Sequence, residues 1–224
     1  MTDGTAPYRT IPEVLCEAAR RDRDGIWIRS DEGAMSFGGA LAQTIATAQA
    51  LRAAGVRHGD PVMVTLRTTP PYLLCWLALA SIGAITVSAN PRSSPAELAG
   101  LAQQTSPRAV ITDAGLHPLI TEAGIAGLPG PGVLDAGELT DGWAVAGPTY
   151  APGAASLGAA VSHGDVAVLI PTSGTTGRSK LVMQTHRAYA MAGEGFPYWM
   201  ELTAADRLMT SLPLFHINAP AYSV

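Results

Sequence analysis

The chain has 224 residues, of which 47% are hydrophobic and 14% charged, and its formal net charge is −4. This composition can bury a sizeable core and excludes intrinsic disorder. It contains neither the basic stripe of a nucleic-acid-binding protein nor a long block of like charge, so we expect no nucleic-acid partner.

The cysteines and the N-terminal residues indicate in which cellular compartment the protein is expected. Cys16 and Cys75 lie in the apolar stretches EVLCEAA and YLLCWLA, which predicts buried thiols in a reducing environment rather than a disulfide. The N-terminal MTDGTAPYRT lacks the basic-then-apolar pattern of a signal peptide. The longest apolar run, residues 72–87, is short for a bilayer span. We therefore expect a cytoplasmic protein without a membrane partner.

The first half of the chain alternates helix and strand signals. Phe37, Leu41 and Ile45 are spaced four apart and predict a helix that ends near Gly55. Strands are predicted over residues 61–66, 85–88 and 109–112. Between them, Pro70-Pro71 is suited to begin an apolar helix, since proline is tolerated in a first turn.

A capping box predicts the next helix. In the stretch SPAE, Ser94 can cap the third helical amide and Glu97 can reach back to the backbone of the cap, so a helix is expected to about Gln104. Strands that alternate with helices over short links are typical of a parallel sheet. The sequence therefore predicts an α/β fold of mostly parallel strands flanked by helices.

The pattern changes between residues 127 and 164, where thirteen of 38 residues are glycine or proline. This predicts an irregular connection with one short edge strand at most, or a subdomain boundary. Strands are expected again over residues 165–170, 181–184 and 207–212, and the stretch LPLFH is expected to be a strand that ends in a turn. Thr185 is placed to cap a helix that runs to about Trp199.

The stretch PTSGTTGRSK, residues 171–180, separates two of these strands and ends on the only lysine of the chain. Its glycines are spaced differently from those of a P-loop or of GxGxxG, so a kinase-type nucleotide site is disfavoured. Turning glycines, hydroxyl donors and Lys180 nevertheless suit an anion such as phosphate. A Gly/Ser/Thr hairpin turn without a ligand is the alternative, and the residues alone leave both interpretations open.

TSGTTGRSK resembles the signature loop of the adenylate-forming superfamily, which includes acyl-CoA synthetases, luciferases and peptide-synthetase adenylation domains. Three other segments resemble that superfamily in matching order: residues 35–66, the stretch LASIGAITVSANP and the stretch SLPLFHINA. There are two departures from the usual pattern. Pro171 replaces an aromatic or polar residue, and Ser179 replaces a proline, which leaves the loop less rigid.

The resemblance implies a set of site residues. The β- and γ-phosphates of ATP would be bound by Thr172, Ser173, Gly174, Thr175, Thr176, Gly177 and Lys180. His216 would lie beside the acyl carboxylate and the adenylate as the catalytic residue, and Asn218 would line the same acyl pocket. On the residues alone, His216 is better explained as a surface or structural histidine. No metal ligands are expected in this chain.

The resemblance also implies an activity. Such enzymes join a carboxylic acid to ATP, release pyrophosphate, and pass the acyl group of the adenylate to a thiol, usually that of coenzyme A. Mg²⁺ would be held largely by residues that this chain does not contain. A non-catalytic nucleotide- or partner-binding module is the alternative.

Members of the superfamily are more than twice as long, so residues 1–224 correspond to the N-terminal part of the large domain, without the C-terminal domain. The apolar end APAYSV favours a truncation, a proteolytic product or one half of a split enzyme. It also predicts an exposed apolar surface that pairs with a missing C-terminal half or forms a homodimer.

Overall fold

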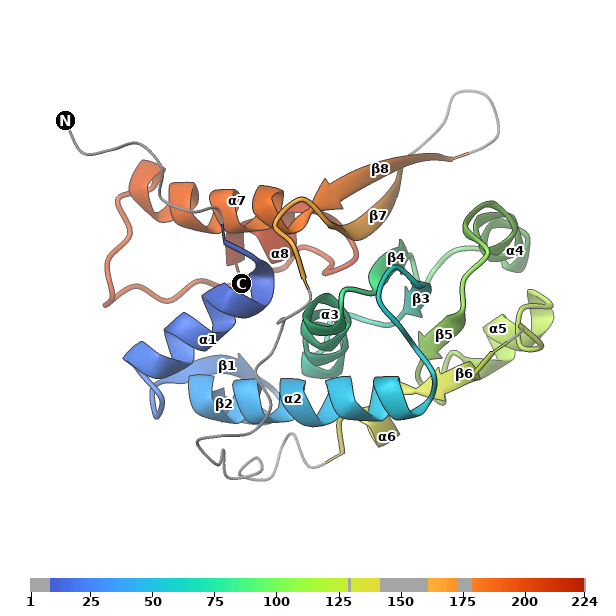
Figure 1. Ribbon diagram of the computed structural model, residues 1–224, viewed down its shortest axis with the longest axis horizontal. Coiled ribbons are helices and arrows are strands. Elements are labelled where there is room, and N and C mark those ends of the chain that lie inside the picture. The colour runs from blue at the N-terminus through green and yellow to red at the C-terminus, as the bar shows by residue number, and fades with distance from the viewer. Residues whose placement is uncertain (1–8, 129, 142–160, 173–178, 224) are drawn as a thin grey trace.

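A six-stranded sheet lies at the centre of the protein (Figure 1). The structure is a computed structural model that describes residues 9–128, 130–141, 161–172 and 179–223. The strand order is β6-β5-β3-β4-β7-β8, with only β8 antiparallel to its neighbour. The strands are β3 (Pro61–Thr65), β4 (Ile85–Ala89), β5 (Ala109–Thr112), β6 (Gly132–Asp135), β7 (Val166–Thr172) and β8 (Lys180–Thr185). The predicted α/β fold with mostly parallel strands is therefore confirmed.

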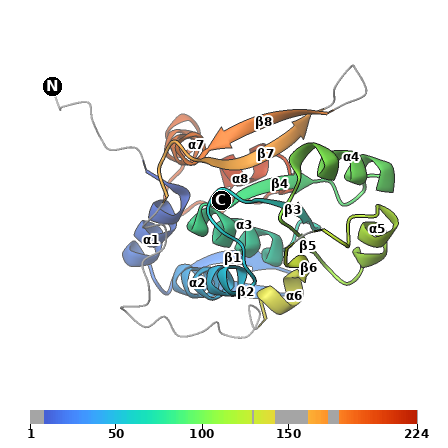
Figure 2. The same ribbon diagram turned by 45° about the vertical axis from the view of Figure 1, so that its right-hand side comes forward.

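Helices cover both faces of the sheet (Figures 1 and 2). Val62 and Val64 point into one core, which includes side chains of α1 (Ile11–Arg21), α2 (Phe37–Ala53), α3 (Pro70–Ile82) and α7 (His186–Trp199). Met63, between them, points into a second core formed with α4 (Pro95–Thr105) and α5 (His117–Glu122). This alternation follows from the pleat of a strand that is buried on both faces.

The local signals explain where the helices begin and end. Ser36 caps α2 by accepting a hydrogen bond from the Gly39 amide, 3.1 Å away. The predicted capping box is present at α4, where the Glu97 side chain accepts from the Ser94 amide at 2.7 Å. Helix α3 is buried along almost its whole length and ends at Gly83, whose φ of 73° favours glycine.

The smaller elements complete the chain. They are the antiparallel hairpin of β1 (Ile26–Ser30) and β2 (Gly33–Ser36), the short helix α6 (Ala136–Leu139) and the C-terminal helix α8 (Asn218–Ser223). The sequence analysis predicted none of these, nor α1 and α5. The short edge strand allowed between residues 127 and 164 is present as β6, and residues 129 and 142–160 lie outside the described part.

Two strand predictions were wrong. Residues 207–212 form no strand, and Leu208, Met209 and Leu212 are exposed there by 52%, 92% and 48%. A strand needs a neighbour for its backbone hydrogen bonds, and in the described residues no strand pairs with this segment. The stretch LPLFH is likewise a turn, which leads into α8.

The described cysteines are both free thiols. Cys75 is buried as predicted, and burial raises the pKa of its thiol to about 12. Cys16 is only half-buried; it packs against the core cluster that includes Leu15 and Ala19 of the same helix but is not enclosed by it. Among the described residues, no helix is both long and apolar enough to cross a bilayer.

Candidate functional site

The two residues that flank the predicted phosphate loop are directly paired. Strands β7 and β8 form an antiparallel hairpin in which Thr172 lies opposite Lys180. The Thr172 hydroxyl donates a hydrogen bond of 3.2 Å to the Lys180 carbonyl oxygen. The hairpin therefore holds both ends of the motif together. The remaining candidates of the motif, Ser173, Gly174, Thr175, Thr176 and Gly177, lie outside the described residues.

This hairpin borders a cleft at the carboxyl ends of the parallel strands. The cleft has a volume of about 300 Å³. Its wall is formed by the two ends of the hairpin, by the end of β4, by α4 with the turn before it, and by the turn before α8. The lining residues are Ser88, Asn90, Ser93, Glu97, Leu98, Leu101, Pro171, Thr172, Ser179, Phe215 and His216. Ligands of α/β sheets bind outside the carboxyl ends of the strands. The cleft is therefore the candidate site.

His216 reaches this cleft from a turn that two hydrogen bonds and two buried side chains hold in place. Leu214 and Phe215 are buried, and the Leu214 amide donates to the Thr68 hydroxyl at 3.2 Å. The His216 amide closes the turn by donating to the Pro213 carbonyl at 3.0 Å. The imidazole is exposed and lies 4.6 Å from the Phe215 ring, centroid to centroid. The fold therefore brings His216 and Thr172 to one cleft although they are 44 residues apart in sequence.

Lys180 and Asn218 are placed differently. Lys180 begins β8 directly after Ser179; it is exposed, and its ammonium makes no ion pair with the rest of the described chain. Its side chain is not part of the cleft wall. Asn218 is exposed at the start of α8 and also does not line the cleft.

The chemistry of the cleft suits a phosphorylated ligand. The hydroxyls of Ser88 and Ser179 can donate to a ligand, whereas the single proton of the Thr172 hydroxyl is engaged by the Lys180 carbonyl. Lys180, whose side chain lies outside the cleft wall, supplies a cation at the residue that follows Ser179. The one carboxylate in the wall, Glu97, is engaged by Ser94, whose amide and hydroxyl hold its pKa below the usual range. Within the described ranges, no group of three or more acidic, histidine or cysteine side chains could hold a metal ion.

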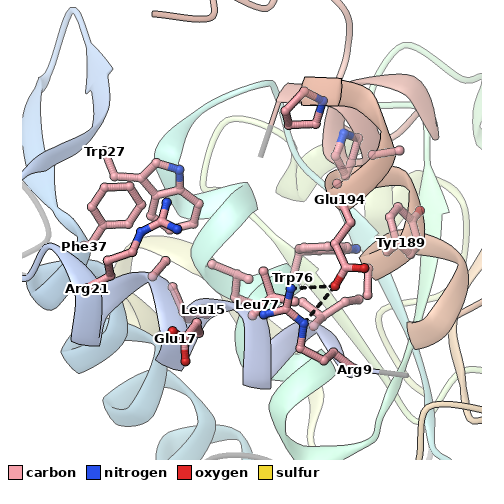
Figure 3. Close-up of a pocket in the computed structure, with 18 residues that line it drawn as sticks. Arg9, Leu15, Glu17, Arg21, Trp27, Phe37, Trp76, Leu77, Tyr189 and Glu194 are labelled. Carbon is pink, nitrogen blue, oxygen red and sulfur yellow. Dashed lines mark hydrogen bonds and ion pairs between the residues drawn. The ribbon is translucent and has the colours of Figure 1, made fainter. Parts of the chain in front are cut away.

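A second cavity, of about 340 Å³, lies between α1, α3, α7 and α8 (Figure 3). Its wall is mostly apolar and includes Trp76 and Tyr189, which pack edge to face with centroids 5.3 Å apart. Arg9 and Glu194 form an ion pair of 2.6 Å at one end. None of the predicted site residues lines it, so it carries no part of the site described above.

Sequence reasoning assigned no role to His186, which the structure places in the core as the first residue of α7. Its side chain is fully buried, and its Nδ1 accepts a hydrogen bond of 3.4 Å from the Ile11 amide. Burial lowers the pKa of the imidazole to about 4. No pattern in the sequence indicated this, because the Ile11 contact spans 175 residues.

The buried His186 predicts a loss of stability in mild acid. The unfolded imidazole, with a pKa near 6.5, binds a proton more readily than the folded one, with a pKa of about 4, so stability falls as the pH drops through this window. We expect this group to account for a loss of about 1–2 kcal/mol between pH 6.5 and 5. Urea unfolding at both pH values measures it.

The control is His186→Asn, which keeps an acceptor for the Ile11 amide but cannot be protonated, and which should remove this part of the pH dependence. His117→Asn replaces an exposed histidine of α5 and should leave it unchanged. Equal pH profiles for the wild type and His186→Asn would contradict a neutral, buried imidazole.

The fold and the cleft define an α/β protein with a candidate ligand site at the carboxyl ends of its strands, and comparison with known families shows to which family it belongs. Residues 15–224 match the family described as AMP-binding enzyme. Because this match covers nearly the whole sequence, the chain belongs to that family, as its resemblance to adenylate-forming enzymes implied.

Curated relatives agree with this assignment. The chain is 33% identical over 189 residues to crotonobetaine/carnitine–CoA ligase of Salmonella paratyphi A, a match that covers 79% of this chain and 37% of that protein. It is 32% identical over 206 residues to 4-coumarate–CoA ligase 5 of Oryza sativa subsp. japonica, covering 89% and 37%. The chain therefore spans little more than a third of the length of these relatives.

Solved structures share the fold. The o-succinylbenzoate coenzyme A synthetase of Bacillus subtilis, in complex with its acyl-adenylate intermediate, matches with a TM-score of 0.79 and 22% identity over 95% of this chain and 41% of that one. The N-terminal subdomain of NpsA from Klebsiella oxytoca matches with a TM-score of 0.73 and 22% identity, covering 92% and 48%. At this identity the likeness concerns the fold alone.

Proposed function

We propose that this chain is the N-terminal part of an ATP-dependent ligase that activates a carboxylic acid as its acyl-adenylate and then forms a thioester with coenzyme A. The observation that carries the proposal is the pairing of Thr172 with Lys180, which sets both ends of TSGTTGRSK beside the cleft that contains His216. The family match and the coenzyme A ligases among the relatives support it.

The residues of the chain have distinct roles in this proposal. Thr172 to Gly177 and Lys180 bind the β- and γ-phosphates of ATP, which supplies the electrophilic α-phosphate. A carboxylate and a polyphosphate repel each other, so the cation of Lys180 and the hydroxyl donors lower the cost of bringing them together. His216 is the proposed catalytic residue beside the acyl carboxylate. Asn218, at the start of α8 and outside the wall of this cleft, would line only the part of the acyl pocket that the rest of the polypeptide completes.

Mg²⁺ and coenzyme A enter the proposal mainly through parts of the enzyme that this chain does not include. The acyl pocket and the thiol path would be completed by the rest of the polypeptide, supplied as a continuation or as a separate half. We propose a cytoplasmic location, as expected for an enzyme that uses ATP and coenzyme A.

The short span of the chain favours a second candidate for these 224 residues alone. Because the matches cover little more than a third of the curated relatives, the chain by itself fits a nucleotide- or partner-binding module without catalytic activity. Trp199 and Met209 are apolar side chains that are 71% and 92% exposed. Such exposure favours binding to a partner, either a missing half of the enzyme or a second copy of this chain.

Isothermal titration with ATP and Mg²⁺, together with pyrophosphate exchange over a panel of carboxylic acids, tests the proposal. We expect the 224-residue chain to bind ATP and to show no exchange, and a longer polypeptide that contains it to show both. Exchange by the chain alone would exclude the binding-module alternative. A longer polypeptide without exchange, combined with unchanged ATP binding in Lys180→Ala, would rule out the ligase.

A further inference from the structure

The segment that leaves the phosphate loop is held against α4. The Gln104 side-chain Nε2 donates a hydrogen bond of 3.1 Å to the carbonyl oxygen of Ser179. Two residues further on, the Leu181 side chain packs against the core cluster that contains Leu98 and Leu101 of α4. In Figure 2, α4 lies beside the ends of β7 and β8 that flank the loop. Helix α4 therefore contacts the chain on both sides of Lys180.

Helix α4, which provides these contacts, is itself restrained by its N-terminal cap and by burial of one face in the core. Its start is fixed by the Ser94–Glu97 capping box. Its inner side is buried through Leu98, Leu101 and Ala102, which are 1%, 8% and 5% exposed. Gln104 is exposed in the last turn of the same helix, so its amide is presented from a part of the backbone that the core holds in place.

Three contacts then fix the backbone around Lys180. Gln104 donates to the carbonyl of Ser179, the Thr172 hydroxyl donates to the carbonyl of Lys180, and the partly buried Leu181 packs against the core cluster of α4. A lysine side chain is long and flexible, so the direction of its ammonium depends on how well its own backbone is anchored. Together, these contacts reduce the conformations that Lys180 would have to give up on binding an anion.

The residue whose carbonyl accepts the Gln104 hydrogen bond is Ser179, and its backbone φ angle is less restricted than that of a proline. Ser179 stands where the resembling sequences have proline, whose ring restricts φ to about −65°. A serine at this position leaves more backbone states to be lost on ordering. The hydrogen bond from Gln104 restricts the same peptide unit without a ring.

We propose that Gln104 is a positioning residue of the phosphate site, which anchors Ser179 so that the Lys180 ammonium is directed to the phosphates of ATP. This inference rests on the proposed function. It assigns a role in nucleotide binding to a side chain of α4 that touches neither nucleotide nor acid.

The test compares Gln104→Ala with Gln103→Ala, its exposed neighbour on the same helix. We expect Gln104→Ala to weaken ATP binding about three- to tenfold, the usual worth of one hydrogen bond, and Gln103→Ala to change it less than about twofold. Hydrogen exchange of the peptide covering residues 179–185 should accelerate only in Gln104→Ala. Isothermal titration and mass spectrometry provide the two measurements, and urea unfolding verifies that both variants are folded.

A rescue variant separates positioning from a general structural effect. Ser179→Pro restricts the same backbone by another means, so in the Gln104→Ala background it should restore most of the lost affinity, whereas in the wild type it should change affinity little. Equal affinity and equal exchange for wild type and Gln104→Ala would overturn the inference, as would a loss that Ser179→Pro leaves unrepaired. If the wild type binds no ATP, the proposed function itself fails, while the exchange data still report whether Gln104 orders residues 179–185.

Discussion

Lys180→Ala is expected to weaken ATP binding about a hundredfold, because a charge-assisted hydrogen bond to phosphate is worth roughly 1.5–3 kcal/mol and the variant loses the only lysine of the chain. The backbone of the hairpin does not depend on this side chain: the bond that links Thr172 to residue 180 uses the carbonyl oxygen of that residue. The unfolding midpoint should therefore remain the same. Isothermal titration at fixed ionic strength measures the affinity.

Two variants show whether the loss is specific. Arg29→Ala removes one positive charge from an exposed position of β1 and should leave affinity unchanged within about twofold, which excludes an effect of net charge. Lys180→Arg keeps the charge with a different shape and should recover only part of the affinity. ATP binding by Lys180→Ala that equals the wild type would contradict the phosphate role of the motif.

Trp76→Ala is expected to lower the free energy of unfolding by about 4 kcal/mol, in the range found for large-to-small changes of buried aromatic residues. Trp76 is 3% exposed in α3, and its ring packs edge to face against Tyr189 of α7. The change removes this contact between two helices and enlarges the cavity of about 340 Å³ that Trp76 lines (Figure 3). Urea unfolding followed by far-ultraviolet circular dichroism measures the loss.

Because domains of this size are stable by only about 5–15 kcal/mol, Trp76→Ala could leave little folded protein. Trp76→Phe keeps an aromatic ring and should cost about half as much. Trp199→Ala removes the same side chain from the end of α7, where it is 71% exposed, and should cost less than about 0.5 kcal/mol. Similar losses for Trp76→Ala and Trp199→Ala would show that the packing of α3 against α7 does not support the fold.

The elements that were predicted well are those with strong local signals. The cap at Thr185, the capping box at Ser94 and the continuous apolar strands of the sheet are all present. Residues 207–212, wrongly predicted as a strand, have β-forming side chains, but no strand in the described part of the chain pairs with them. Strand formation depends on partners that are distant in the chain, whereas a helix forms most of its hydrogen bonds locally.

The sequence by itself determined the α/β class and the family, because TSGTTGRSK and the alternation of strands and helices are read over short distances. Only the tertiary structure decided which candidate residues meet: it placed His216 and Thr172 in one cleft, left Asn218 outside it, and brought Gln104 to Ser179 across 75 residues. The burial of His186 was also decided at that level. Such contacts arise from the packing of distant segments, which no local pattern encodes.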